Sequence, residues 1–157
     1  LWGARNGVQF ALTFVALNYA PSVGGAQDHI RHVAEGLAAR GHQVRVVTTD
    51  NLRAPSGRDP GVIPEREARV GGVEVRRYAV PRWLLKPQLA LRWLYWQMPW
   101  APEDVFDRVP PPILAGPLSP GLLAAVRRAL RSSDVVVGCS APYLTVVAPA
   151  ALPLPSR

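Results

Sequence analysis

A chain of 157 residues, 48% of them apolar and 18% charged, can bury the core of one globular domain, and this composition excludes an intrinsically disordered protein. The formal net charge of +7 favours anionic partners such as phosphorylated ligands, acidic membrane surfaces or nucleic acid, without choosing among them. The single cysteine, Cys139, excludes an internal disulfide and fits a reducing compartment.

The first predicted element is a strand from Val8 to Asn18, because nearly every residue there is apolar. A continuous apolar run is typical of a parallel strand covered on both faces. A signal peptide is a poorer interpretation, since the run leads directly into a glycine turn and no small-residue cleavage site follows. No run in the chain approaches the roughly 18 apolar residues that a membrane-spanning helix needs.

A glycine turn and an amphipathic helix follow this strand. Gly24 and Gly25 open a predicted helix from Ala26 to Arg40, and Gly41 ends it where a left-handed residue is expected. One face of the helix is apolar at the i, i+3, i+4, i+7, i+8 spacing: Ile30, Val33, Ala34, Leu37 and Ala38. The segment up to Thr48 is a second buried strand, so the region predicts a strand–helix–strand unit of a doubly wound α/β fold.

The glycine pair suggests a chemical role. Glycine lets the backbone approach a ligand closely, and the start of a helix presents free amide groups and a positive dipole end to an anion. We therefore predict a phosphate site at Gly24 and Gly25. The alternative is that the two glycines only form a tight turn.

Ligands of doubly wound sheets bind beyond the carboxyl ends of the strands. Residues at or just after the carboxyl ends of the predicted strands are therefore candidate ligand-edge residues: Asn18, Tyr19, Asp50, Cys139 and Ser140. Three histidines, at 29, 32 and 42, have no accompanying set of ligands, so we predict no metal site.

Residues 51–72 are polar and contain several prolines and glycines, and they predict a long loop. Residues 73–80 then alternate in polarity, with a slip before Tyr78, as in an edge strand. Ser119 and Pro120 open another helix as N-cap and first helical residue. Residues 134–140 are predicted to form a further buried strand.

Between these elements lies an aromatic and proline-rich insertion, residues 81–117. Its helical stripe carries Trp93, Trp96 and Trp100, with Arg92 among them. Aromatic anchors beside cations suit an interfacial membrane helix or a groove for a lipid-linked acceptor. The alternative is a helix or lid packed on the sheet.

Four segments in order, residues 19–29, 37–48, 72–82 and 134–142, resemble the N-terminal domain of family 4 glycosyltransferases of the GT-B fold. The resemblance covers nearly the whole chain and implies a Rossmann-like, mostly parallel sheet flanked by helices. It also implies transfer of a sugar from a nucleotide-diphosphate sugar to an acceptor, with retention at the anomeric carbon and no further cofactor. The glycine pair, Gly24 and Gly25, would approach the donor diphosphate.

The resemblance further implies an acceptor that is lipid-linked or a cell-envelope precursor, and a cytoplasmic enzyme peripheral to the inner face of the membrane. Members often carry a histidine near the end of the strand at 134–140, but Val137 and Cys139 stand there. Catalytic residues are therefore not identified, and His29 is a weak candidate. Cys139 lacks an adjoining histidine and reads as a small buried residue.

The sequence has no counterpart of the family's second domain, which binds the nucleotide and supplies two glutamates. We therefore expect residues 1–157 to form one acceptor-side domain that is inactive alone. The alternative function is a non-catalytic basic module that binds a phosphorylated ligand or an anionic membrane. Nucleic-acid binding is not expected, because the arginines are scattered and no recognition motif is present.

Overall fold

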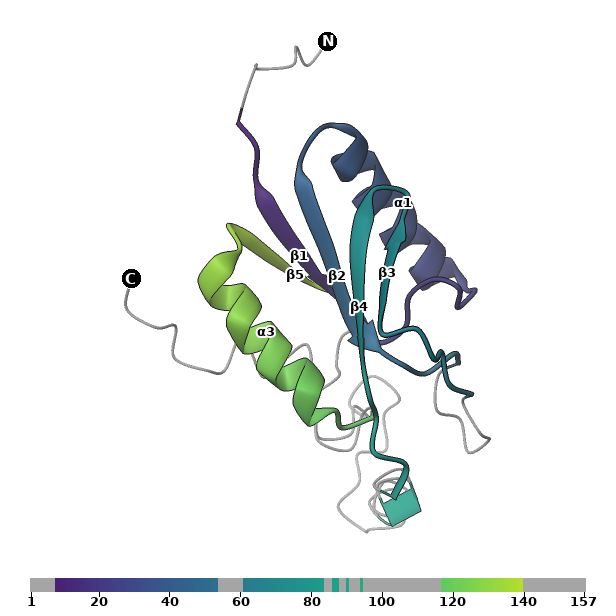
Figure 1. Cartoon of the computed structure of the whole chain (residues 1–157). Helices are drawn as coiled ribbons and strands as arrows, with labels where there is room; N and C mark the ends of the chain where they lie inside the picture. Colours follow the sequence, from purple (N-terminus) through teal and green to yellow (C-terminus); the bar gives the residue numbers. More distant parts are fainter. Residues whose placement is uncertain are drawn as a thin grey trace, which may run out of the picture.

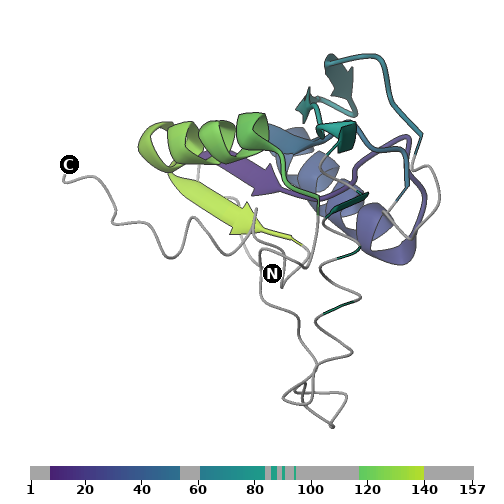
Figure 2. The same ribbon diagram turned by 90° about the horizontal axis from the view of Figure 1, so that it is seen from below.

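The computed structural model of the chain describes residues 8–53, 61–83, 86–87, 90, 94 and 117–139. These residues form a sheet with two helices on its opposite faces (Figures 1 and 2). The elements, in chain order, are β1 (Ala11–Val15), α1 (Gly25–Ala39), β2 (Gln43–Thr49), β3 (Glu67–Val70), β4 (Val73–Tyr78), α3 (Pro120–Ser132) and β5 (Val135–Gly138).

The strand order is β3-β4-β2-β1-β5. Strands β4, β2, β1 and β5 run parallel, and β3 pairs antiparallel with β4. This arrangement confirms the predicted α/β class with a Rossmann-like, mostly parallel sheet. The carboxyl ends of the four parallel strands therefore meet at one edge of the sheet, called the carboxyl edge below.

Strand β1 is shorter than the predicted strand from Val8 to Asn18. Val8 and Phe10 are exposed and precede the first residue that pairs with β2. Ala16 still donates a backbone hydrogen bond to Val47 O at 3.1 Å, so the chain continues along β2 just past the end of the strand. The apolar run thus includes both flanks of the strand.

Helix α1 ends as its sequence predicts. Gly41 has a φ of 88° and donates to Ala38 O at 2.9 Å, while His42 donates to Leu37 O at 3.2 Å. These two bonds form the Schellman pattern, which places a left-handed residue where glycine costs least. The helix covers one face of the sheet through Ile30 and Ala34.

The core lies in two layers, one on each face. On the α1 face, alternate residues of the central strands are buried against the helix: Phe14, Ala16, Val44, Val46, Val73 and Val75. On the α3 face, the buried cluster is Val15, Val47, Leu122, Ala125 and Val126. This double coverage explains why β1 is apolar along most of its length and why β2 buries both Val46 and Val47.

The loop predicted over residues 51–72 contains a strand. Residues Glu67–Val70 form β3, and the turn at Gly71 and Gly72, with φ of 55° and 84°, joins it to β4. Strand β4 is therefore not an edge strand, as predicted, because it lies between β3 and β2. The predicted slip before Tyr78 is also wrong, since β4 alternates regularly and buries Arg77.

Ser119 caps α3 as predicted: its hydroxyl accepts from Leu122 N at 3.3 Å, and Pro120 is the first helical residue. Strand β5 is less buried than predicted. Val135 is 44% exposed, because β5 is the end strand of the sheet formed by the described residues. Most of the predicted insertion, residues 81–117, lies outside the described residues.

Candidate functional site

Two asparagines meet at the carboxyl edge, where β1 and β2 end. Asn18 donates from Nδ2 to the carbonyl oxygen of Asn51 at 2.8 Å, and Thr49 donates from Oγ1 to Leu17 O at 2.7 Å. These bonds hold together the segments that leave the two strands. Two of the segments predicted to lie at the ligand edge are thus brought side by side.

Several polar atoms at this edge are buried and make no hydrogen bond to any described residue. They are Asn18 Oδ1, Asn51 Oδ1, Asn51 Nδ2 and Thr48 Oγ1. A buried polar atom without a partner costs about 1–3 kcal/mol, so such atoms cluster where a ligand or water completes the bonding. Asn51, with 0% exposure, ends the segment after β2 that we predicted at the ligand edge, but it is not among the predicted site residues, because asparagine after a strand reads as a turn residue.

The start of α1 is open. No side chain caps the helix, and a Cβ atom built on Gly25 would meet no other atom within 4 Å. At Gly24 the φ of 164° is extended backbone, and a Cβ atom there would overlap the tip of the Gln27 side chain, which folds back over this residue. The amide groups of the first helical turn therefore face space that an anion can enter.

Arg77 fixes the loop that carries these glycines. Its side chain donates from Nη2 to Ala20 O at 2.7 Å and from Nη1 to Glu65 O at 3.0 Å. Burial lowers the pKa of Arg77, and the nearby Glu65 carboxylate acts in the opposite direction. The sequence alone did not reveal this role, because an arginine in an alternating strand is read as a solvent-facing residue.

Asp50 lies at the predicted ligand edge, but both oxygens of its carboxylate accept hydrogen bonds from other residues of the chain. Oδ1 accepts from Val80 N at 3.0 Å, and Oδ2 accepts from Arg66 Nη1 at 3.0 Å. The side chain is almost fully buried. Asp50 thus ties the ends of β2 and β4 to the loop before β3.

Tyr19 packs in the interior, and Cys139 is partly buried beside the same cluster. Tyr19 is fully buried in the cluster beneath α1, and burial, aided by the Glu35 carboxylate, raises its pKa to about 12. Cys139 continues past β5, donates its backbone amide to Val15 O at 2.8 Å and packs against the same cluster. Burial raises the pKa of the Cys139 thiol, which opposes a role as a nucleophile.

The other predicted site residues are placed as follows. His29 is exposed on α1, four residues beyond its first residue. Ser140, Arg92, Trp93, Trp96 and Trp100 lie outside the described residues. Trp83, at the start of the insertion, is described and is 74% exposed.

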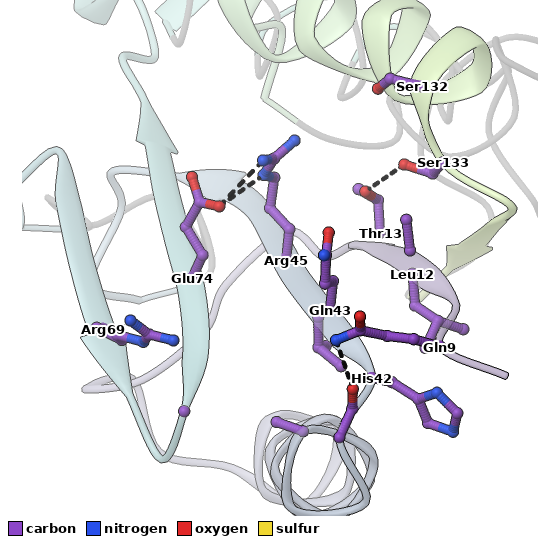
Figure 3. A pocket seen from close by; sticks show the side chains of 15 residues that line it. Gln9, Leu12, Thr13, His42, Gln43, Arg45, Arg69, Glu74, Ser132 and Ser133 are labelled. Atoms are coloured by element: carbon purple, nitrogen blue, oxygen red, sulfur yellow. Dashed lines mark hydrogen bonds and ion pairs between the residues drawn. The ribbon is translucent and has the colours of Figure 1, made fainter. Parts of the chain in front are cut away.

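A cavity of about 780 Å³ lies at the opposite, amino edge of the sheet (Figure 3). Its lining comes from the starts of β1 and β2 and the ends of both helices, and includes Gln9, Thr13, His42 and Ser133. Helix carboxyl ends present carbonyl oxygens, which do not attract a diphosphate. Despite its size, this cavity is therefore a poorer place for the predicted anion than the open start of α1.

Across the described ranges, no three His, Cys, Asp or Glu side chains are grouped so that they could hold a metal ion. A search of the same ranges for a helix of the length and apolarity needed to cross a bilayer found none.

The chain is similar to glycosyltransferases. The sequence model of the glycosyl transferase 4-like domain matches residues 24–155. The glycogen synthases of two Mycobacterium tuberculosis strains, CDC 1551/Oshkosh and ATCC 25618/H37Rv, are each 38% identical over 65 residues, which is 41% of this chain and 15% of the relative. No solved structure matches the chain.

The match to the domain covers most of the chain, including α1, its glycine start and β5. The mostly parallel sheet with helices on both faces agrees with that match. The resemblance predicted from the sequence is therefore confirmed, and the chain belongs to the glycosyl transferase 4-like domain family, whose chemistry is glycosyl transfer.

Proposed function

We propose that this chain is the acceptor-side half of a retaining glycosyltransferase that takes a sugar from a nucleotide-diphosphate donor. The observation that carries the proposal is the open start of α1 at Gly24 and Gly25, at the carboxyl edge of a parallel sheet. Amide groups and a helix dipole at that point offer hydrogen bonds to phosphate oxygens.

The neighbouring contacts support the proposal because they hold this start in place. Arg77 binds Ala20 O, and Asn18 binds Asn51 O, so the first half of the loop between β1 and α1 is held by β4 and by the segment that follows β2. Because this part of the loop is already ordered, a ligand that binds there causes a smaller loss of conformational entropy.

The remaining features of the proposal come from the family resemblance. Retention at the anomeric carbon, the nucleotide contacts and a pair of glutamates would belong to a second domain. Asp50, whose carboxylate lies at the carboxyl edge, is occupied by Val80 and Arg66, so it is a poor general base. We therefore expect no sugar transfer by residues 1–157 alone, and transfer when a matching second domain is joined to them.

We compare two classes of acceptor for the proposed sugar transfer. The similarity to glycogen synthases favours a glucan chain, whereas the tryptophan-rich insertion favours a lipid-linked acceptor at a membrane surface. Exposed Trp83 supports the second possibility. Flotation with anionic liposomes distinguishes them: binding lost in a Trp93→Ala/Trp96→Ala variant supports the membrane acceptor, and an unbound wild type favours the glucan.

The donor site is tested by calorimetric titration with UDP, ADP and GDP. At Gly25 an added methyl group meets no atom of another part of the chain within 4 Å, so Gly25→Ala acts chiefly on the approach of a phosphate, whereas Gly24→Ala must also displace the tip of the flexible Gln27 side chain. We expect each variant to weaken the best nucleotide at least about tenfold. Gly36→Ala, in the same helix but far from its start, is the matched control. Equal affinity in wild type and both glycine variants would contradict the proposal.

A further inference from the structure

The cavity of Figure 3, about 780 Å³ in volume, lies at the edge of the sheet opposite the glycine start of α1. We call it the amino-edge cavity. Strand β2 has seven residues, which span roughly 23 Å, so the two places are well separated. Ligand clefts have volumes of about 300–1,000 Å³, and this cavity is therefore large enough for a drug-sized molecule. Its polar lining includes Gln9, Thr13, His42, Gln43, Arg69 and Ser133.

Three side chains in this lining have hydrogen-bonding groups that the fold leaves available. Gln43 and Arg69 are exposed, and neither side chain makes a hydrogen bond or an ion pair with any residue that the structure describes. Gln9, which is also exposed, donates from Nε2 to Gly41 O at 2.8 Å, and its Oε1 remains as an acceptor. In Figure 3, Arg69 and Gln9 extend into the cavity from two sides, and Gln43 lies between them.

Hydroxyl and imidazole groups add to this set. Thr13 Oγ1 and Ser133 Oγ lie 2.8 Å apart, and only one of their two protons forms the bond between them. Ser133 is the more exposed of the two and can bond further to a ligand. His42 Nδ1 accepts from Phe10 N at 3.4 Å, so Nε2 carries the ring proton as a donor. Donors and acceptors thus stand side by side, which suits hydroxyl groups because each of them donates and accepts.

The charges around the amino-edge cavity nearly cancel. Arg45 donates from Nε to Glu74 Oε2 at 3.0 Å, and these two lining residues neutralise each other. The carboxyl ends of α1 and α3 both border the cavity, and each end carries roughly half a negative charge. The guanidinium group of Arg69 offsets the two helix ends. An uncharged polar ligand therefore suits this lining better than an anion does, although the chain as a whole carries a net charge of +7.

An aromatic ring flanks the cavity. Phe10 is 44% exposed, and its ring centroid lies 5.7 Å from that of the lining residue His42. One face of a sugar ring consists of C–H groups, which pack favourably on an aromatic side chain, while the hydroxyl groups around the ring need polar partners. Phe10 and the polar lining together provide both kinds of contact.

We propose that the amino-edge cavity binds a short, uncharged oligosaccharide, with hydroxyl groups on Gln9, Gln43 and Arg69 and a ring face against Phe10. The family chemistry is glycosyl transfer, so a carbohydrate is the hydroxyl-rich ligand that agrees with the rest of the chain. This site is separate from the donor site at Gly25 and does not depend on nucleotide binding there. An acceptor chain held at the cavity would be kept near the carboxyl edge at a raised effective concentration, a consequence that rests on the proposed function.

The test titrates maltohexaose, cellohexaose, mannohexaose and pyrophosphate separately into the nitrogen-15-labelled chain and follows its backbone amide resonances. The cavity variant is Gln43→Ala/Arg69→Ala, which removes two exposed side chains of the lining. The matched control is His32→Ala/Arg127→Ala, which also removes one polar side chain and one arginine, at exposed positions that do not line the cavity. Circular dichroism verifies that each variant is folded.

We expect at least one hexasaccharide to shift the amide resonances of Gln9, Gln43 and Ser133 with one dissociation constant. The cavity variant should raise that constant at least about tenfold, because two sets of hydrogen bonds are lost, and the control variant should leave it unchanged. Pyrophosphate should not shift these three resonances.

The proposal is overturned if none of the three sugars gives saturable shifts, if the shifts are confined to the carboxyl edge, or if both variants lose affinity equally. Saturable binding of pyrophosphate at the same three amides would also overturn it, because the cavity would then be an anion site. Sugar binding at the amino edge and nucleotide binding at Gly25 are read from different resonances, so a failure of this proposal is distinguishable from a failure of the proposed function.

Discussion

Arg77 and Ala20 are joined by a hydrogen bond of 2.7 Å, from the guanidinium group of one to the backbone carbonyl of the other. The bond links an inward-facing residue of β4 to the loop between β1 and α1, which lie far apart in the sequence. Arg77 is only 5% exposed, so the bond is protected from water. Through it, the sheet holds the loop that carries the glycine pair.

Replacing Arg77 with methionine should therefore destabilise the chain and weaken nucleotide binding together. The change leaves the carbonyls of Ala20 and Glu65 without their donor, and hydrogen bonds to a charged group contribute about 1.5–3 kcal/mol each. Because the change also removes the cost of burying the guanidinium group, we expect the free energy of unfolding in urea to fall by less than the sum of the two bonds, about 2–4 kcal/mol.

The neighbouring variant Arg76→Met is the control. Arg76 faces the opposite side of β4 and makes half-exposed ion pairs, which contribute at most about 1 kcal/mol. Similar losses of stability in the two variants would contradict the role given to Arg77.

Asp50 should be a structural residue and not a ligand-binding one. Asp50→Ala removes the acceptor of Val80 N, a buried amide, so we expect a loss of about 1–3 kcal/mol in the free energy of unfolding. Arg66→Ala leaves the buried carboxylate bonded to Val80 N but without its cation, so it should also destabilise the fold, by about 1–3 kcal/mol. Nucleotide affinity that falls in Asp50→Ala with unchanged stability would show instead that the carboxylate contacts the ligand.

Tyr19 should make the fold sensitive to alkali. Its pKa is raised from 10.0 to about 12 in the folded chain, so the unfolded chain loses this proton first as pH rises. The contribution is fully present below pH 10 and is lost as pH rises from 10 to about 12. Urea unfolding across this range should show a steeper fall for wild type than for Tyr19→Phe. Parallel curves for the two proteins would contradict the burial of the hydroxyl group.

Local sequence signals were sufficient to predict much of the fold. The spacing of Ile30 and Ala34, the glycine at 41 and the Ser119–Pro120 pair each act within one or two helical turns, and the structure has both helices in these places. The parallel sheet followed from apolar runs that alternate with helices. The two helices are determined by contacts between residues close in sequence, whereas the pairing of the strands is not.

Features that depend on partners distant in sequence were missed. Strand β3 has four residues, two of them charged, and it forms because the turn at Gly71 and Gly72 folds it onto β4. The burial of Arg77 depends on two carbonyls from separate loops. Asp50 likewise finds its partners at Arg66 and Val80, so its position after a strand did not reveal its role.

The central claim is that the open start of α1 binds a diphosphate, and backbone amide chemical shifts test it most directly. The chain is labelled with nitrogen-15 and titrated with UDP, ADP and GDP. We predict that the amide resonances of Gly25, Ala26 and Gln27 shift together and saturate with one dissociation constant for the preferred nucleotide. If these three resonances stay fixed while amides elsewhere shift and saturate, the diphosphate binds at another place and the claim is wrong.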